Sequence, residues 1–130
     1  MAAKKASDLY IAAGAPIHMN VDGNVPPINE QRMTPEGIQK VCYEVMTAQQ
    51  IKTYEETLEI NLSLVIPEIG NFRINIYRQR GSMALVARYV SFNIPNLKDL
   101  NLPPFLYDLI MEKRGLILVV GPTGSGKSST

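Results

Sequence analysis

The sequence predicts an α+β domain over residues 1–90, followed by a linker over residues 91–104 and the start of an α/β domain over residues 105–130. Three observations support this prediction. Apolar and polar residues alternate in several short segments of the first part, which is typical of strands. Two segments with helical spacing and N-terminal capping residues lie between them. After a proline-rich stretch, an uninterrupted apolar run at residues 116–120 is typical of a parallel strand buried on both faces.

Residues 8–28 predict a small antiparallel meander. Gly14-Ala15-Pro16 separates the first strand from the second, and Asp22-Gly23 suits a two-residue hairpin turn. The chain is therefore expected to begin with short strands joined by tight turns.

Two helices are predicted to follow this meander. Thr34 offers a capping hydroxyl before Pro35, and apolar residues then recur at helical spacing, which indicates a helix over residues 35–46. Thr47 and Gln50 form a capping-box pattern, which indicates a second short helix that ends near residue 55.

Alternation returns after the helices and predicts three more strands. Residues 60–66 alternate as in a strand with one buried face. The next strand has two distinct faces, with Phe72, Ile74 and Ile76 on one side and Arg73, Asn75 and Tyr77 on the other. A last strand over residues 83–90 follows the Gly81-Ser82 turn. We expect these strands to form an antiparallel sheet with the two helices packed on it.

Residues 91–104 differ in composition from the domain before them. Prolines and asparagines replace the alternating pattern, which predicts a stiff polar linker. A helix over residues 105–113, ended by Gly115, is predicted to follow and to lead into a strand over residues 116–120.

Composition limits the classes of function. The 130 residues carry 13 Lys and Arg against 12 Asp and Glu, a net charge of +1, so no overall field favours nucleic acid or anionic lipid as a partner. The single cysteine, Cys42, excludes an internal disulfide and a zinc site built from several thiolates. Because no apolar run approaches the roughly 20 residues that cross a bilayer, we expect a cytosolic protein that is neither exported nor membrane-spanning.

The residues after the apolar run carry the clearest chemistry. Gly121-Pro122-Thr123-Gly124-Ser125-Gly126-Lys127-Ser128 fits every fixed position of G-x-x-x-x-G-K-[ST], the P-loop or Walker A motif. Its glycines let backbone N–H groups point at one phosphate anion, Lys127 supplies a charge for the β- and γ-phosphates, and Ser128 offers a hydroxyl to Mg²⁺. With Ser129, these residues form the predicted site for ATP and magnesium. The alternative is a glycine-rich turn that leads into a helix.

The chain has little sequence beyond this loop, because only Ser129 and Thr130 follow it. Hydrolysis also needs an acidic residue that holds Mg²⁺ and a group that orients or activates water. We therefore expect no catalytic residue in this chain and no ATP turnover by the chain alone, although the parent protein is expected to be a P-loop ATPase.

Several further motifs occur along the whole chain: Ser7-Asp8-Leu9, Gly14-x-Pro16, Phe72-Arg73-Ile74-Asn75, Gln79-Arg80-Gly81, Arg88, Ile94-Pro95, Leu100-x-Leu102-Pro103, and Arg114-Gly115-Leu116 running into the P-loop. Together they resemble the PilT/PilU retraction ATPases of type IV pili. Members of that family usually carry a helix before the position of Ser7, so we expect this chain to be a fragment trimmed at both ends.

The resemblance implies a PAS-like N-terminal domain joined by the linker to a RecA-like ATPase domain, with ATP in the cleft between them. It implies a homo-hexamer in the cytoplasm, peripheral to the inner membrane at the pilus base. The implied partners are an inner-membrane platform protein and a related retraction ATPase, but no nucleic acid. In such a motor, ATP hydrolysis powers pilus disassembly and twitching motility.

The resemblance also implies a role for three arginines. Those at the positions of Arg73 and Arg88 reach from the N-terminal domain to the ATP phosphates, and Arg80 is a third candidate. The predicted strands agree in part, because Arg73 and Arg88 lie on adjacent strands and away from the face of Phe72. Guanidinium groups also suit phosphate oxygens. The alternative is a solvated basic strand face.

Three other functions stay open. A ligand-sensing PAS-like domain that precedes an ATPase would hold a small molecule in an apolar pocket of its core, whereas the arginine hypothesis requires a filled core and an exposed arginine face. An assembly module would present an apolar surface for subunit contacts. A different ATPase of the type II/IV secretion superfamily is the nearest enzymatic alternative.

Overall fold

The structure of the 130-residue chain is a computed structural model that describes residues 1–92, 96, 98–121 and 126–127. The chain divides into two compact units, Met1–Phe92 and Asn93–Thr130. Each unit is described by itself.

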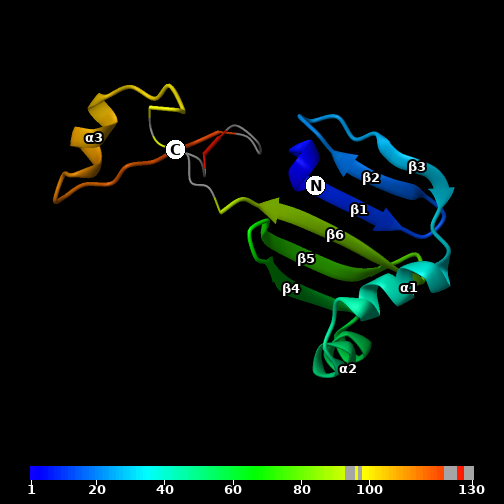
Figure 1. The fold of residues 1–130 in the computed structure, drawn as a ribbon. Coiled ribbons are helices and arrows are strands. Elements are labelled where there is room, and N and C mark those ends of the chain that lie inside the picture. The colour runs from blue at the N-terminus through cyan, green and yellow to red at the C-terminus, as the bar shows by residue number, and fades with distance from the viewer. Residues whose placement is uncertain (93–95, 97, 122–125, 128–130) are drawn as a thin grey trace. The chain divides into compact units, whose positions relative to one another are not determined.

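The first unit is built on a six-stranded sheet in the order β3-β2-β1-β6-β5-β4, in which all neighbouring strands are antiparallel (Figure 1). A short 3₁₀ turn, η1 (Ala2–Lys4), precedes the sheet. The strands are β1 (Asp8–Ala12), β2 (Pro16–Asn20), β3 (Pro27–Arg32), β4 (Glu59–Ile66), β5 (Gly70–Gln79) and β6 (Ser82–Val90). The α+β class predicted from the sequence is confirmed for this unit.

Two meanders, each of three consecutive strands, make up the sheet. The first consists of β1, β2 and β3, and the second of β4, β5 and β6. They join where β1 pairs with β6, over a register that runs from Asp8 opposite Arg88 to Ala12 opposite Ala84. Figure 1 shows these two central strands side by side. This pairing brings together residues that are far apart in the sequence.

Two capped helices connect the meanders. Helix α1 (Pro35–Glu44) begins after Thr34, whose hydroxyl accepts a 3.0 Å hydrogen bond from the backbone N–H of Gly37. Helix α2 (Ala48–Thr57) begins after Thr47 with a complete capping box. The predicted helices are confirmed, and each end lies within two residues of its predicted position.

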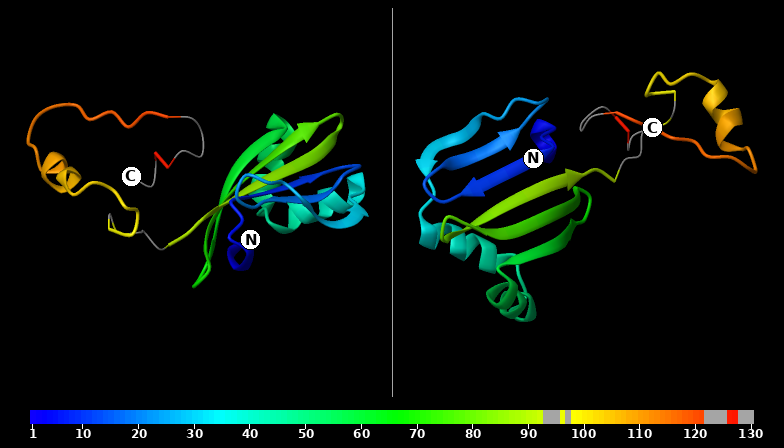
Figure 2. Two further views of the ribbon diagram at one scale, coloured as in Figure 1. Left: turned by 90° about the horizontal axis from the view of Figure 1, so that it is seen from above. Right: turned by 180° about the vertical axis from the view of Figure 1, so that it is seen from behind.

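Both helices lie on one face of the sheet (Figure 2), and the core lies between them and that face. Ile38 and Cys42 of α1 are fully buried against Ile76 of β5. Tyr54 of α2 packs into the same cluster. Because side chains alternate along a strand, the other face of the sheet carries Arg73 and the polar residues that alternate with this core.

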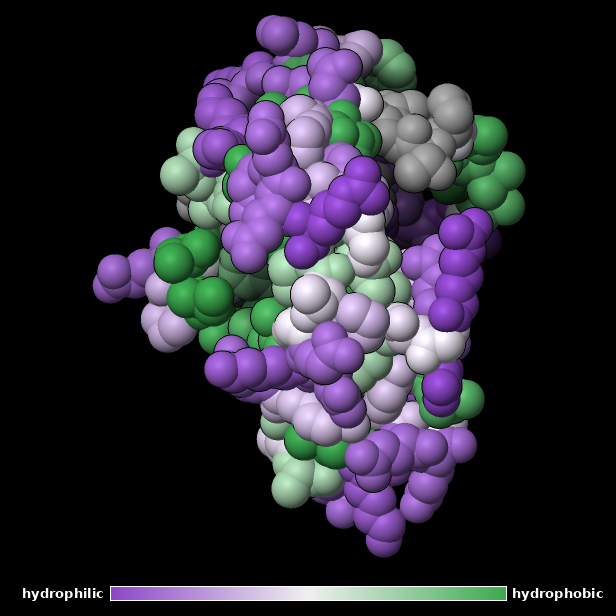
Figure 3. All heavy atoms as spheres, turned by 90° about the vertical axis from the view of Figure 1, so that its right-hand side faces the viewer, coloured by the Kyte–Doolittle hydropathy of each residue, from purple (hydrophilic) through white to green (hydrophobic). Residues whose placement is uncertain are grey.

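Strand β3 forms one edge of the sheet, and all of its residues are exposed. Figure 3 shows the side of the molecule on which β3 and α1 lie in Figure 1. Hydrophilic and hydrophobic residues are interspersed on this side rather than gathered into one apolar surface. Pro26 and Pro27 at the start of β3 also limit pairing with a further strand, because proline has no N–H to donate.

The second unit contains α3 (Phe105–Ile110), which is shorter than the predicted helix over residues 105–113. This helix has no buried residue and no side-chain cap, so little stabilises a longer one. The predicted strand at residues 116–120 is not found: these residues are irregular and between 50% and 87% exposed. A strand needs a neighbour for its backbone hydrogen bonds, and the described residues provide none here.

None of the helices among the described residues combines the length and the apolar character needed to cross a membrane.

Candidate functional site

A row of five polar side chains crosses the sheet on the face opposite the helices. Asn20, Asp8, Arg88, Arg73 and Ser63 lie directly opposite one another on β2, β1, β6, β5 and β4. Directly opposed residues of neighbouring strands project to the same side of a sheet. The pairing of the strands therefore gathers these five side chains on one surface.

Two arginines stand at the centre of this row. Arg73 and Arg88 are cross-strand neighbours, and the Arg88 side chain is 62% exposed. Within the described part of the chain, the side chain of Arg73 is exposed and makes no hydrogen bond or ion pair. Both arginines line a surface hollow of about 520 Å³ together with Asn61, Leu62, Ser63, Ile74, Asn75 and Val86.

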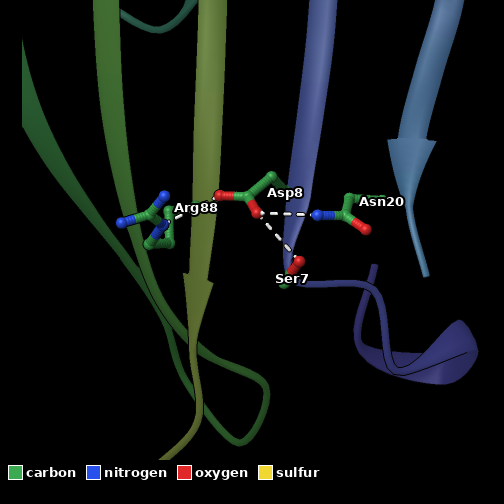
Figure 4. A network of polar contacts seen from close by, with 4 residues as sticks. All are labelled: Ser7, Asp8, Asn20 and Arg88. Carbon is green, nitrogen blue, oxygen red and sulfur yellow. Dashed lines mark hydrogen bonds and ion pairs between the residues drawn. The ribbon is translucent and has the colours of Figure 1, made fainter. Parts of the chain in front are cut away.

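Asp8 holds one of the two arginines (Figure 4). Its Oδ1 atom accepts a 2.8 Å hydrogen bond from Nε of Arg88, which is also an ion pair. Its Oδ2 atom accepts hydrogen bonds from the Ser7 hydroxyl at 2.8 Å and from Nδ2 of Asn20 at 3.4 Å. Asp8 is only 6% exposed, so these three donors replace the water that a carboxylate otherwise binds.

Opposing effects set the charge of Asp8. Burial by itself raises the pKa of this carboxyl, because it disfavours the charged form, but the hydrogen bonds from Arg88, Ser7 and Asn20 and the charge of Arg88 lower it. Together the lowering effects are larger, so the pKa of Asp8 lies below its usual value. The hydrogen bond and the charge of Asp8 raise the pKa of Arg88. Both groups are therefore charged at neutral pH.

Amides, a hydroxyl and the carboxylate of Glu59 surround the arginines on β4 and β5. Nδ2 of Asn75 donates to Oδ1 of Asn61 and to Oε1 of Glu59, both at 3.1 Å. The Ser63 hydroxyl donates to Oδ1 of Asn71 at 2.8 Å. Because Asp8 compensates only one of the two central guanidiniums, this surface is suited to an anion whose oxygens accept several hydrogen bonds.

Arg80, the third predicted arginine, lies elsewhere. Gln79 pairs with Ser82, so Arg80 and Gly81 form the two-residue turn between β5 and β6. Both have positive φ, 50° and 84°, as a type I′ turn requires. Seven residues along a strand separate Arg80 from Arg73, a distance of roughly 23 Å. The structure therefore does not bring Arg80 together with the other two arginines.

Most of the predicted P-loop lies outside the described residues, which include only Gly121, Gly126 and Lys127 of the motif. Gly126 has a φ of 86°, a conformation that favours glycine. Pro122, Thr123, Gly124, Ser125, Ser128 and Ser129 lie outside the description, so the ATP and magnesium site stays a prediction.

Asp8, like Asn20 and Ser63 of the same row, was given no functional role from the sequence. An aspartate is unfavourable in a strand. Its position at the start of β1 was therefore the feature of the sequence that could have indicated a special role. Its partner Arg88 lies 80 residues further along the chain. Nothing in the local pattern of either segment shows that β1 pairs with β6.

Comparisons with known proteins extend over the whole chain. The family model described as "Type II/IV secretion system protein" matches residues 1–130. The chain is 39% identical over 130 residues to the type IV pilus ATPase PilU of Pseudomonas aeruginosa, covering 100% of this chain and 34% of that protein. It is 35% identical to the "Type IV pilus retractation ATPase PilT" of the same organism, covering 96% of this chain and 36% of that protein.

A solved structure of the pilus retraction motor PilT with bound ADP has a similar fold. The match has a TM-score of 0.78 and 41% sequence identity, and it covers 98% of this chain and 37% of the PilT chain. The resemblance noted from the sequence motifs is confirmed by these matches. This chain spans about a third of the length of the relatives that it matches.

Proposed function

Because the chain belongs to the type II/IV secretion system protein family, we propose that it is the N-terminal part of a type IV pilus retraction ATPase. In this proposal the complete protein forms a hexamer in the cytoplasm at the inner-membrane base of the pilus. It couples ATP hydrolysis to pilus disassembly and twitching motility through a platform protein. Similarity to two pilus ATPases over at least 96% of this chain supports the assignment.

The observation that carries this proposal is the exposed pair of arginines on the open face of the sheet. Arg73 and Arg88 are direct neighbours across β5 and β6, and Asp8 compensates only one of their charges. Two adjacent guanidiniums offer a planar set of donors that matches phosphate oxygens, and a polyphosphate supplies the negative charge that both require. We assign Arg73 and Arg88 to the phosphates of ATP.

The P-loop completes the proposed nucleotide site. The backbone of residues 121–129 and the ammonium group of Lys127 hold the phosphates, and the hydroxyl of Ser128 is a ligand for Mg²⁺. When bound, Mg²⁺ neutralises charge on the phosphates during transfer. Arg80 is left out of this assignment because it lies at the other end of the β5–β6 hairpin.

The state of the core favours this function over a ligand-sensing domain. A sensor needs an apolar cavity inside the domain. Here Ile38, Cys42 and Ile76 are fully buried in the space between α1 and the sheet, while a surface hollow of about 520 Å³ lies on the arginine face. A filled core and an exposed cationic face are the features that the motor function requires.

The test is ATP hydrolysis by the protein at the full length of its relatives. We expect Lys127→Ala and Arg73→Ala each to lower kcat/KM by about 10²-fold or more, because each removes a charge that stabilises the phosphates. Arg78→Ala is the matched control, because Arg78 lies on the same strand as Arg73 but lines a different hollow with Tyr43 and Glu55.

A wild-type rate in the Arg73 variant would exclude Arg73 from the phosphate site. A wild-type rate in the Lys127 variant would contradict the ATPase assignment itself.

A further inference from the structure

We propose that Asp8 is a positioning residue, which holds Arg88 by its Nε atom so that both terminal guanidinium nitrogens face an incoming phosphate beside Arg73. This inference rests on the proposed function, because it concerns how one of the two assigned arginines is made ready for its ligand.

The contact between Asp8 and Arg88 uses only one nitrogen of the guanidinium. Nε donates to Oδ1 at 2.8 Å, and within the described part of the chain Nη1 and Nη2 of Arg88 make no hydrogen bond. A carboxylate bound to both Nη1 and Nη2 would occupy the terminal edge of the guanidinium. The observed contact instead leaves the Nη1–Nη2 edge available, and this edge can bind two phosphate oxygens at once.

Asp8 can hold the guanidinium in place because it is itself fixed. It lies opposite Arg88 in the paired central strands, it is buried, and Ser7 and Asn20 both donate to its second oxygen. The Arg88 side chain, by contrast, is mostly exposed. A free arginine loses much of its rotamer entropy when it binds a ligand. A side chain already held in place loses less, so its binding is stronger.

The charge of Asp8 also permits the two arginines to stand side by side. Like charges directly opposite each other on neighbouring strands repel, and Arg73 and Arg88 are such a pair. Asp8 lies on the far side of Arg88, on β1, which neighbours β6 but not β5. It therefore compensates the charge of Arg88 and makes no ion pair with Arg73. The charge of Arg73 stays available to the ligand.

Positioning and simple charge have opposite effects on the binding of an anion. Asp8 is negative, so removing its charge alone should strengthen the attraction of this surface for phosphate. Removing a positioning contact should weaken binding, because Arg88 would then be ordered only when the ligand arrives. The direction of the change in affinity after Asp8→Asn therefore separates the two roles.

The experiment follows the arginine Nε–Hε signals of the ¹⁵N-labelled 130-residue chain by NMR during titration with tripolyphosphate. The chain carries Lys127→Ala, so that the P-loop ammonium does not bind the probe. We expect the signals of Arg73 and Arg88 to shift together in this background. Adding Asp8→Asn should move the Arg88 signal before any ligand is present, and should raise the midpoint of the titration at least threefold.

Asp22→Asn is the matched control for charge. Asp22 lies in the exposed turn between β2 and β3, two residues from Asn20, but its carboxylate makes no hydrogen bond with Ser7, Asp8, Asn20 or Arg88. This change removes one negative charge without touching the network, so the midpoint should stay the same or fall slightly. If Asp8→Asn does not fold, Asn20→Ala replaces it, because it removes one donor to Asp8 and should raise the midpoint by a smaller factor.

The outcomes separate this inference from the proposed function. A midpoint that is unchanged or lower in the Asp8 variant, with both arginine signals still shifting, overturns the positioning role and leaves the arginines as phosphate ligands. The absence of any shift at Arg73 and Arg88 in the Lys127→Ala background overturns both.

Discussion

The buried carboxylate of Asp8 shows how one residue can link the fold to the candidate site. A charged group that is only 6% exposed is stable only when other groups replace its water. Ser7, Asn20 and Arg88 do so, and they come from three different places in the first unit. The same network that permits the burial of Asp8 also orients the guanidinium of Arg88.

This network predicts how stability depends on pH. Because the folded pKa of Asp8 lies below the value of about 3.9 of an unfolded aspartate, the network stabilises the fold above about pH 4. That stabilisation is lost as the pH falls through the folded pKa. At pH 7 we expect Asp8→Asn to lower the free energy of unfolding by about 1–3 kcal/mol, and we expect the difference from the wild type to shrink at pH 3.

Urea denaturation of the wild type and the variant at pH 7 and pH 3 measures this difference. Asp22→Asn again serves as the control, because it removes a carboxylate in an exposed turn. An equal loss of stability at both pH values would show that Asp8 acts by shape and not by charge.

Gly70 illustrates a second requirement at the scale of one residue. It has a φ of 153°, and a Cβ atom here would lie 2.9 Å from the carbonyl oxygen of Val90 and against the ring of Tyr89. The Tyr89 hydroxyl donates to the carbonyl of Ile69 at 2.7 Å and closes the same corner. Only glycine therefore lets β5 begin so close to the end of β6.

At the scale of the element, helix α2 depends strongly on its cap. The N–H of Gln50 donates to the Thr47 hydroxyl at 3.3 Å, and the Gln50 side chain accepts from the N–H of Thr47 at 2.8 Å. We expect Thr47→Ala to lower the free energy of unfolding by about 1 kcal/mol, because it leaves a backbone donor at the helix start without its partner.

Thr53→Ala in the same helix is the matched control for the cap, and both variants are measured by thermal denaturation. The Thr53 hydroxyl donates to the carbonyl of Gln49 inside the helix, a bond that adds little to helix stability. Alanine also has the higher helix propensity, so this change should alter stability by less than about 0.5 kcal/mol. Equal losses in the two variants would contradict a specific role of the cap.

Local chemistry explains why these elements were predictable from the sequence. The caps at Thr34 and Thr47, the turn at Gly81, which begins one residue earlier than predicted, and the alternation around Ile74 and Ile76 each depend on neighbouring residues only. The helices and the second meander were found from them.

The central pairing could not be predicted in this way. Nothing near Asp8 or Arg88 in the sequence indicates that β1 lies beside β6. Arg73 and Arg88 were therefore predicted to lie on adjacent strands, but no role was predicted for Asp8. The apolar run at residues 116–120 was read as a strand because of its composition, yet a strand also depends on a neighbour that composition does not supply.

At the scale of the whole molecule, the two units differ in how much structure each contains. Among the residues that the structure describes, every paired strand and every residue of the hydrophobic core belongs to Met1–Phe92. The described part of the second unit holds one six-residue helix without a buried residue, and its apolar run is exposed. The stability of the chain is therefore expected to come from the first unit.

We predict that residues 1–92 fold alone, with a melting temperature within a few degrees of that of the whole chain, because the core and all strand pairs are retained. Circular dichroism and an amide NMR spectrum measure this. Ile76→Ala in the shortened chain provides the positive control: it should lower stability by about 2–5 kcal/mol and the melting temperature by roughly 10 °C or more, because it removes a fully buried side chain. A shortened chain that melts without a cooperative transition would show instead that the first unit needs residues 93–130 to fold.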